Sequence, residues 1–367
     1  MLADPDIFPK VQPPGYEWLA DEPAFDARAH LALEAPERVW TMEELGYTAE
    51  QAACYASPIA VTTPVRLLSP AGVKAMLGVA EQLKPFMRKN SNSRIPAVLR
   101  GTIFRSRFMR DFCNAPEVTD YFSDLFQVPL APHTLPHQLG HMNFNPDDVT
   151  LPVDKWHHDI TALDYVLMLH NPRAIQGGRF EYFFGTREEG KRLLEEKGEL
   201  PADRIVSPDF KDAGYAVFMQ GCAVFHHASR LEQPAFRASL VNSYVSRDVR
   251  YTDANRTFFV KTVPGGPFSD EQSLIEKRGR YTDWARHKAW TSRAKLGTLL
   301  EELPFTEDRQ QIIQALKDAV ADVHGAIAML EAGDRTFEEM REIRDRDEAN
   351  YYSNPVRLTD RRRQAAE

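Results

Sequence analysis

Two residues with metal-binding side chains stand two positions apart in the motif Trp156-His157-His158-Asp159. If this segment is a β-strand, His157 and Asp159 project from one face, because side chains alternate along a strand. One imidazole and one carboxylate on one face supply two of the three protein ligands of a non-haem iron(II) site. The spacing alone is weak, since a chain with 11 histidines contains about one such match by chance. A surface histidine beside an acid is the alternative interpretation.

A third ligand is available downstream, where the apolar segment 221–225 is followed by His226 and His227. We expect this segment to be a strand that ends in the two histidines. Because neighbouring side chains on a strand point to opposite faces, only one of the two can join His157 and Asp159. The pattern leaves both histidines open.

Arg237 and Ser239 begin the next apolar strand, over 239–245. A guanidinium binds a carboxylate through two parallel hydrogen bonds, and the serine hydroxyl can add a third. The alternative is an ordinary ion pair between Arg237 and Glu232. Upstream of the His-x-Asp motif, Asn143 could contact the same ligand or could be a polar residue at a strand edge.

The order of these motifs resembles the iron(II)- and 2-oxoglutarate-dependent dioxygenases, nearest to the phytanoyl-CoA hydroxylase-like branch. The residues that carry the resemblance are W-H-x-D at 156–159, the Gly177-Gly178 turn, G-x-x-x-x-H from Gly221 to His226, and R-x-S at 237–239. The similar region spans residues 100–250. The resemblance implies a double-stranded β-helix of the jelly-roll or cupin-like kind. It also implies iron(II), dioxygen and 2-oxoglutarate, with release of succinate and carbon dioxide.

The same resemblance assigns roles to individual residues. His157, Asp159 and His226 would be the catalytic metal ligands, because His226 falls at the family position counted from Gly221. Arg237 and Ser239, with Asn143, would bind 2-oxoglutarate. The reaction would be hydroxylation or another oxidation of a small-molecule metabolite. A metal-dependent hydrolase at the same ligands and a catalytically silent cupin-like binding protein are the rival functions.

The pattern of residue types along the chain predicts a mainly β core at 96–260 between helical extensions at 1–95 and 261–367. Expected strands lie at 165–169, 180–184, 214–218, 223–225 and 239–245. Helices are expected after Ser69-Pro70, over 186–197, and from a Thr306 cap to a Gly333 stop, followed by a capping box at Thr336 and Glu339. The third helix carries an apolar stripe from Ile312 to Leu330, which must pack on the β core or on a second copy of the chain, making a homodimer.

Composition limits the remaining functions. The formal net charge of -8 disfavours nucleic-acid binding, and no apolar segment predicts a membrane span or signal peptide. The three cysteines show no CxxC spacing, which favours a reducing, cytoplasmic compartment. Four arginines, at 100, 105, 107 and 110, alternate with apolar residues, and one of them could meet an acidic substrate while the others form a solvated face.

Overall fold

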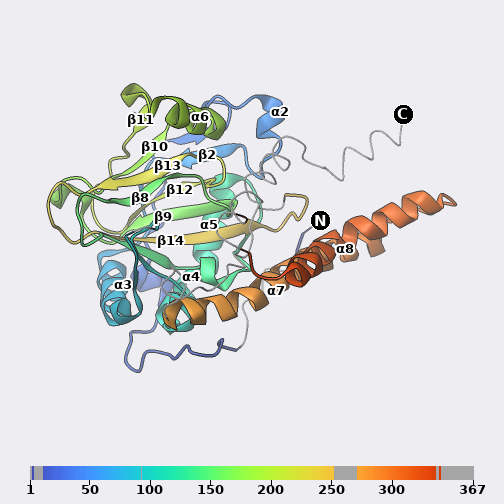
Figure 1. Ribbon diagram of the computed structural model, residues 1–367, viewed down its shortest axis with the longest axis horizontal. Coiled ribbons are helices and arrows are strands. Elements are labelled where there is room, and N and C mark those ends of the chain that lie inside the picture. The colour runs from blue at the N-terminus through green and yellow to red at the C-terminus, as the bar shows by residue number, and fades with distance from the viewer. Residues whose placement is uncertain (1, 4–10, 92, 252–270, 336–338, 340–367) are drawn as a thin grey trace.

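The computed structural model describes residues 2–3, 11–91, 93–251, 271–335 and 339. Its centre consists of two antiparallel sheets, with helices around them (Figure 1). The large sheet has the order β1-β2-β12-β9-β14-β7-β5-β4, and β3 and β6 pair with β12 and β14. The small sheet has the order β11-β10-β13-β8.

The strands of the large sheet are β1 (Val39–Thr41), β2 (Ile59–Thr62), β3 (Val65–Arg66), β4 (Arg88–Lys89), β5 (Ala97–Leu99), β6 (Leu130–Pro132), β7 (His141–Phe144), β9 (Leu163–Met168), β12 (Tyr215–Met219) and β14 (Ala238–Ser246). Those of the small sheet are β8 (Pro152–His157), β10 (Phe180–Phe183), β11 (Ile205–Val206) and β13 (His226–Arg230). From β7 to β14 the pairing is nested, because β7 pairs with β14, β8 with β13, β9 with β12 and β10 with β11.

The α-helices are α1 (Ala27–His30), α2 (Ala49–Ala52), α3 (Pro70–Leu83), α4 (Arg107–Cys113), α5 (Pro116–Phe126), α6 (Arg187–Lys197), α7 (Glu271–Glu302) and α8 (Arg309–Ala332). Short 3-10 helices are η1 (Lys84–Phe86), η2 (Thr102–Phe104), η3 (Pro136–Gln138), η4 (Pro172–Ala174) and η5 (Ala202–Arg204). In the described part of the chain, no helix has the length and apolar character needed to cross a bilayer.

Central strands β9 and β14 are buried along their whole length, which explains their nearly continuous apolar sequences. Helix α5 covers them on one side through aromatic contacts. The Phe122 ring centroid lies 4.7 Å from that of Phe218 on β12 and 5.0 Å from that of Tyr244 on β14. This rigid layer carries the inner side chains of β7, β9 and β14 that face the small sheet.

Several expected elements are confirmed. Ser69 caps α3 by accepting from Gly72 N, Thr186 caps α6, and Gly333 ends α8. The Thr306 cap is wrong, because Asp308 accepts from the first amides of α8 while Thr306 Oγ1 accepts from Asp308 N. Thr336 of the expected capping box with Glu339 lies outside the described residues, so that capping box stays a prediction.

Other expectations need correction. The segment 1–95, expected as a helical extension, also supplies β1 to β4, and β4 pairs with β5 across the expected boundary at residue 96. These strands have two to four residues, too few to show a period. Of the arginines expected to form a solvated face, Arg105 follows η2 and is buried, whereas Arg107 and Arg110 lie on α4. Residues 221–225 form a turn, in which Ala223 N and Val224 N donate to Gln220 O, so β13 begins only at His226.

The packing of the C-terminal helices also differs from the expected arrangement. Helix α7 is bound to the core through buried polar contacts, since His137 of η3 lies 3.0 Å from the Tyr16 hydroxyl and 2.6 Å from Asp283 of α7. Helix α8 pairs with α7, and the two extend away from the sheets (Figure 1). The expected burial of its apolar stripe on the β core is therefore wrong for most of the stripe, since Ile327 and Leu330 stay exposed and only Ala319 and Ala326 of the helix are buried. Leu316 remains 47% exposed.

Candidate metal centre and its cavity

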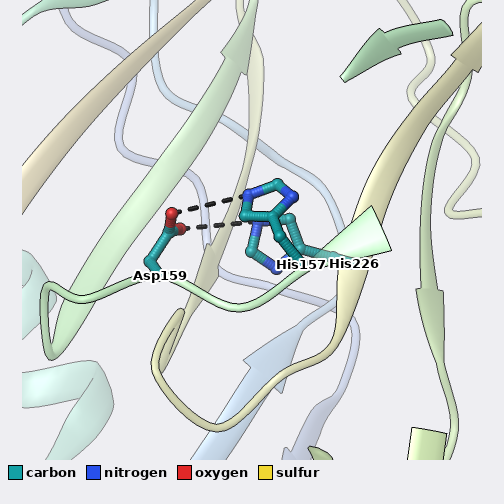
Figure 2. A group of neighbouring side chains, drawn as sticks. All are labelled: His157, Asp159 and His226. Atoms are coloured by element: carbon teal, nitrogen blue, oxygen red, sulfur yellow. Dashed lines mark ion pairs between the residues drawn. The ribbon is translucent and has the colours of Figure 1, made fainter. Parts of the chain in front are cut away.

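Three side chains meet between the two sheets with the geometry of a metal site. His157 Nε2 lies 3.5 Å from Asp159 Oδ1, and His226 Nε2 lies 3.4 Å from Asp159 Oδ2 (Figure 2). One ligand atom from each residue lies within 4.8 Å of the other two. The group combines two imidazoles and one carboxylate, the ligand set of facial non-haem iron(II) sites.

The backbone sets the orientation of both imidazoles. His157 Nδ1 donates to Lys155 O at 2.7 Å, and His226 Nδ1 donates to Val224 O at 2.9 Å. A neutral imidazole that carries its proton on Nδ1 has a free lone pair on Nε2. Both Nε2 atoms therefore face the carboxylate as donors suited to a metal, and backbone carbonyls support them as they do in known metal sites.

The protonation states of His157 and Asp159 also suit metal binding. Burial, and next the positive charge of Arg94, lower the pKa of His157 below its ordinary value. The imidazole is therefore neutral near pH 7. Burial alone would raise the pKa of Asp159, but its contacts with His157 and His226 hold that pKa well below the usual range. The centre thus presents neutral nitrogen and anionic oxygen, the protonation states that metal binding needs.

A β-bulge aligns the two histidines. In the pairing of β8 with β13, His157 is directly opposite His226, but Asp154 is opposite Ala228, so β8 contains one extra residue. A bulge redirects the side chains beside it. As a result Asp154 and His157, three residues apart, share one face, and His157 Nδ1 lies 3.6 Å from Asp154 Oδ1.

Asp159 reaches the centre from a loop, because β8 ends at His157. Its amide donates to Gly221 O at 2.9 Å, so the 221–225 turn holds the loop that carries the carboxylate. A Cβ on Gly221 would lie 2.8 Å from Asp159 Oδ2 and 2.2 Å from Asp164 Oδ2, so only glycine fits here. Burial, and next the charge of Asp159, raise the pKa of Asp164 well above its ordinary value.

His227 points away from the centre, as strand alternation requires. Its Nε2 lies 2.9 Å from Glu181 Oε2, and its ring stacks on Trp156 with centroids 3.9 Å apart. Of the two histidines left open by the sequence, the structure brings His226 to His157 and Asp159.

Arg237 directly precedes β14, Ser239 lies within it, and both line the cavity, as expected. Arg237 is 1% exposed and donates from Nε to Gly178 O at 3.2 Å and from Nη1 to Ser239 Oγ at 2.7 Å. Asn145 Oδ1 accepts from the Arg237 amide, which fixes the start of the strand. Gly178 has φ of +65°, a conformation that favours glycine and turns its carbonyl toward the guanidinium.

The expected alternative for Arg237 does not occur, because no ion pair joins it to Glu232 or to any other acid among the described residues. Burial lowers the pKa of Arg237 to about 10, and the charge of Asp154 opposes that change. A buried cation without an acid partner is costly unless an anion arrives. Arg237 is therefore a buried guanidinium that is held in one orientation and has no acid partner among the described residues.

The side chains of the candidate metal centre and Arg237 line one cavity, which is partly open to solvent. Asn143 lines it too, and its backbone carbonyl accepts from Arg237 Nη1 at 3.4 Å. Two buried polar atoms on β7, Asn143 Oδ1 and His141 Nδ1, have no hydrogen-bond partner in the described structure. Such atoms indicate a ligand, because buried polar groups are normally paired.

The sequence reasoning missed two cavity residues, Arg94 and Asp154, and also Asp164, which is buried beside Asp159. Arg94 lies in a polar loop with no period or motif. Asp154 would face away from His157 on a regular strand, and only the bulge turns it inward. Asp164 is a lone acid within an apolar strand, and that was the one visible signal. Among the expected arginines, Arg105 contacts Gly15 O and the Phe86 ring, away from the cavity.

No protein-family model and no curated protein matches the chain. Solved structures that are similar to parts of it include a non-heme alpha ketoglutarate dependent epimerase, SnoN, and a carbocyclase, SnoK, both from nogalamycin biosynthesis. SnoN has 16% identity and a TM-score of 0.40 over 51% of this chain and 78% of its own. SnoK has 17% identity and a TM-score of 0.40 over 58% and 87%.

EctD from S. alaskensis, solved with 2-oxoglutarate and 5-hydroxyectoine, has 16% identity and a TM-score of 0.38 over 62% of this chain and 84% of its own. At these values the likenesses assign neither a family nor a reaction to this chain. Its function is argued below from its own residues.

Proposed function

We propose that the chain is an iron(II)- and 2-oxoglutarate-dependent oxygenase that oxidises a small-molecule metabolite and releases succinate and carbon dioxide. The observation that carries this proposal is the position of Arg237. It is buried, has no acid partner among the described residues, and lines the same cavity as His157, Asp159 and His226. A metal centre and a separate cation in one cavity suit a ligand that has a chelating end and a carboxylate end.

In this proposal, His157, Asp159 and His226 hold the iron and leave its other coordination positions for ligands. Bound iron(II) would supply dioxygen activation coupled to oxidative decarboxylation of 2-oxoglutarate. Arg237 and Ser239 bind the distal carboxylate of the cosubstrate, and the Asn143 side chain offers a hydrogen bond along its length.

The nested pairing from β7 to β14 supports a double-stranded β-helix, because an eight-stranded double sheet of this kind is a jelly roll. Membership in the phytanoyl-CoA hydroxylase-like branch and hydroxylation as the outcome belong to the same proposal. A cytoplasmic location fits a small-molecule enzyme of this type. Homodimer formation through α7 and α8 stays a prediction.

The test is succinate release by the purified chain with iron(II), 2-oxoglutarate, dioxygen and a metabolite library. We expect succinate to form in step with an oxidised metabolite, and His157→Ala and Asp159→Ala to abolish both while the protein stays folded. A hydrolase at the same ligands would convert substrates without consuming 2-oxoglutarate. A silent binding protein would do neither, and normal turnover in either variant would refute the ligand assignment.

A further inference from the structure

A second cation lines the same cavity and has no role in the chemistry proposed above. Arg94 forms an ion pair with Asp154, in which its Nε lies 3.3 Å from Asp154 Oδ1. Neither Nη atom donates a hydrogen bond to a described residue. The side chain is 38% exposed, whereas Arg237 is buried, so Arg94 lies where the cavity opens.

A buried histidine of the cavity wall also has a ring nitrogen without a hydrogen-bond partner in the described structure. His141 on β7 is 8% exposed and lines the cavity, and its Nδ1 has no hydrogen-bond partner in the described structure. Burial, and next the charge of Arg100, lower the pKa of His141 well below its ordinary value, with Arg94 contributing in the same direction. The imidazole is therefore neutral, and one ring nitrogen is free to hydrogen-bond a ligand.

The surrounding charge is positive. Arg100 has no ion pair with a described residue, and its Nη1 donates only to Gln138 Oε1, at 3.4 Å. Arg88 and Arg280 both contact the buried acid Glu276, at 3.5 and 3.2 Å. Burial, and next the charge of Arg280, lower the pKa of Arg100 to about 9, and the charge of Glu276 opposes that change.

Within the cavity itself the charges cancel. Arg94 and Arg237 balance Asp154 and Asp159, and a divalent metal balances doubly charged 2-oxoglutarate. Arg100, whose charge acts on His141, forms no ion pair with a described residue. A substrate that brings a negative group to this wall would restore neutrality.

We propose that the primary substrate carries an anionic oxygen group, a carboxylate or a phosphate, that binds the Nη atoms of Arg94 and hydrogen-bonds His141 at the cavity mouth. The inference rests on the proposed function in one respect, namely that Arg237 is taken by the cosubstrate. Arg94 is then a substrate-binding residue that places the metabolite beside the metal centre. Substrates without such a group bind poorly.

The test uses the full chain loaded anaerobically with iron(II) and saturating 2-oxoglutarate, which occupies Arg237. Acetate and methylphosphonate are titrated separately by calorimetry at constant ionic strength, set with chloride. We expect saturable binding of at least one probe, and the stronger probe identifies the group as carboxylate or phosphate. Arg94→Gln should weaken that binding by about tenfold or more, and Arg94→Lys should weaken it less.

Arg192→Gln is the matched control, because Arg192 is an exposed arginine with one acid partner, Glu196 of α6, away from the cavity. It should leave probe binding unchanged. Absence of binding by both probes, or equal binding by Arg94→Gln and the parent, refutes the anion site. A loss of 2-oxoglutarate affinity in Arg94→Gln would move Arg94 to the cosubstrate and refute it too. If the parent binds a probe through Arg94 but binds neither iron nor 2-oxoglutarate, the proposed function fails and the anion site stands.

Discussion

Replacing Arg237 with alanine tests the role of the buried cation. The guanidinium is 1% exposed and is held by Gly178 O, Asn143 O and Ser239 Oγ at 3.2, 3.4 and 2.7 Å. The protein has therefore met the cost of burying and orienting the charge before 2-oxoglutarate binds. The Arg237→Ala variant removes both the charge and the planar fork that would meet the distal carboxylate.

The expected magnitude follows from that burial. Removing one partner of a buried, hydrogen-bonded charge pair costs on the order of 2–5 kcal/mol. Since 1.4 kcal/mol is a factor of ten, the dissociation constant of 2-oxoglutarate should rise by roughly thirtyfold to several thousandfold. Arg237→Lys should recover part of the affinity, because lysine keeps the charge and loses the two parallel hydrogen bonds.

The assay is anaerobic calorimetry of 2-oxoglutarate binding to the iron(II)-loaded chain. Arg105→Ala is the matched control, because Arg105 is 3% exposed but contacts Gly15 O and the Phe86 ring. It should lower the melting temperature without changing 2-oxoglutarate affinity. If Arg237→Ala binds 2-oxoglutarate as tightly as the parent, another residue holds the carboxylate and the argument from burial is wrong.

Three further predictions concern the metal loop, acid stability and assembly. Gly221→Ala places a Cβ 2.2 Å from Asp164 Oδ2, so iron titration should show affinity lower by about tenfold or more, and parent-like affinity contradicts the packing argument. Burial lowers the pKa of His170 from 6.5 to about 4, so the unfolded chain takes up the proton first and the free energy of unfolding falls as the pH drops from 6.5 toward 4. The melting temperature of His170→Gln should therefore depend less on pH than that of the parent. Parallel curves of melting temperature against pH for the two proteins would refute this. Leu300 and Leu316 are 87% and 47% exposed, so light scattering should give a dimer for the parent and a monomer for the double glutamate variant, and an unchanged mass contradicts assembly through these helices.

Much of the site was predictable because its key residues lie in pairs close to one another in the sequence. Arg237 directly precedes β14 and Ser239 follows two residues later, so the alternation of an extended chain predicts both side chains on one face. The meeting of His157 with Asp159 was also expected, but for an incomplete reason. Asp159 lies beyond the strand, and its place depends on a long-range hydrogen bond to Gly221 O that no spacing reveals.

Other features depended on tertiary contacts that a single sequence does not show. Asp154 faces the cavity because β8 bulges, and its sequence is compatible with a regular strand. The apolar run at 221–225 was read as a strand, whereas burial within a turn explains the same composition. Short strands such as β4 form because a longer sheet already offers an edge, so their own residues give almost no signal.

The most direct test of the account compares iron binding in His226→Ala and His227→Ala after anaerobic reconstitution. The two residues are adjacent, but only His226 Nε2 faces Asp159, while His227 bonds Glu181 on the other side of the strand. We predict that His226→Ala loses iron and succinate formation and that His227→Ala keeps the iron with at most a modest loss of stability. Retained iron in His226→Ala together with loss in His227→Ala would contradict the metal centre described here.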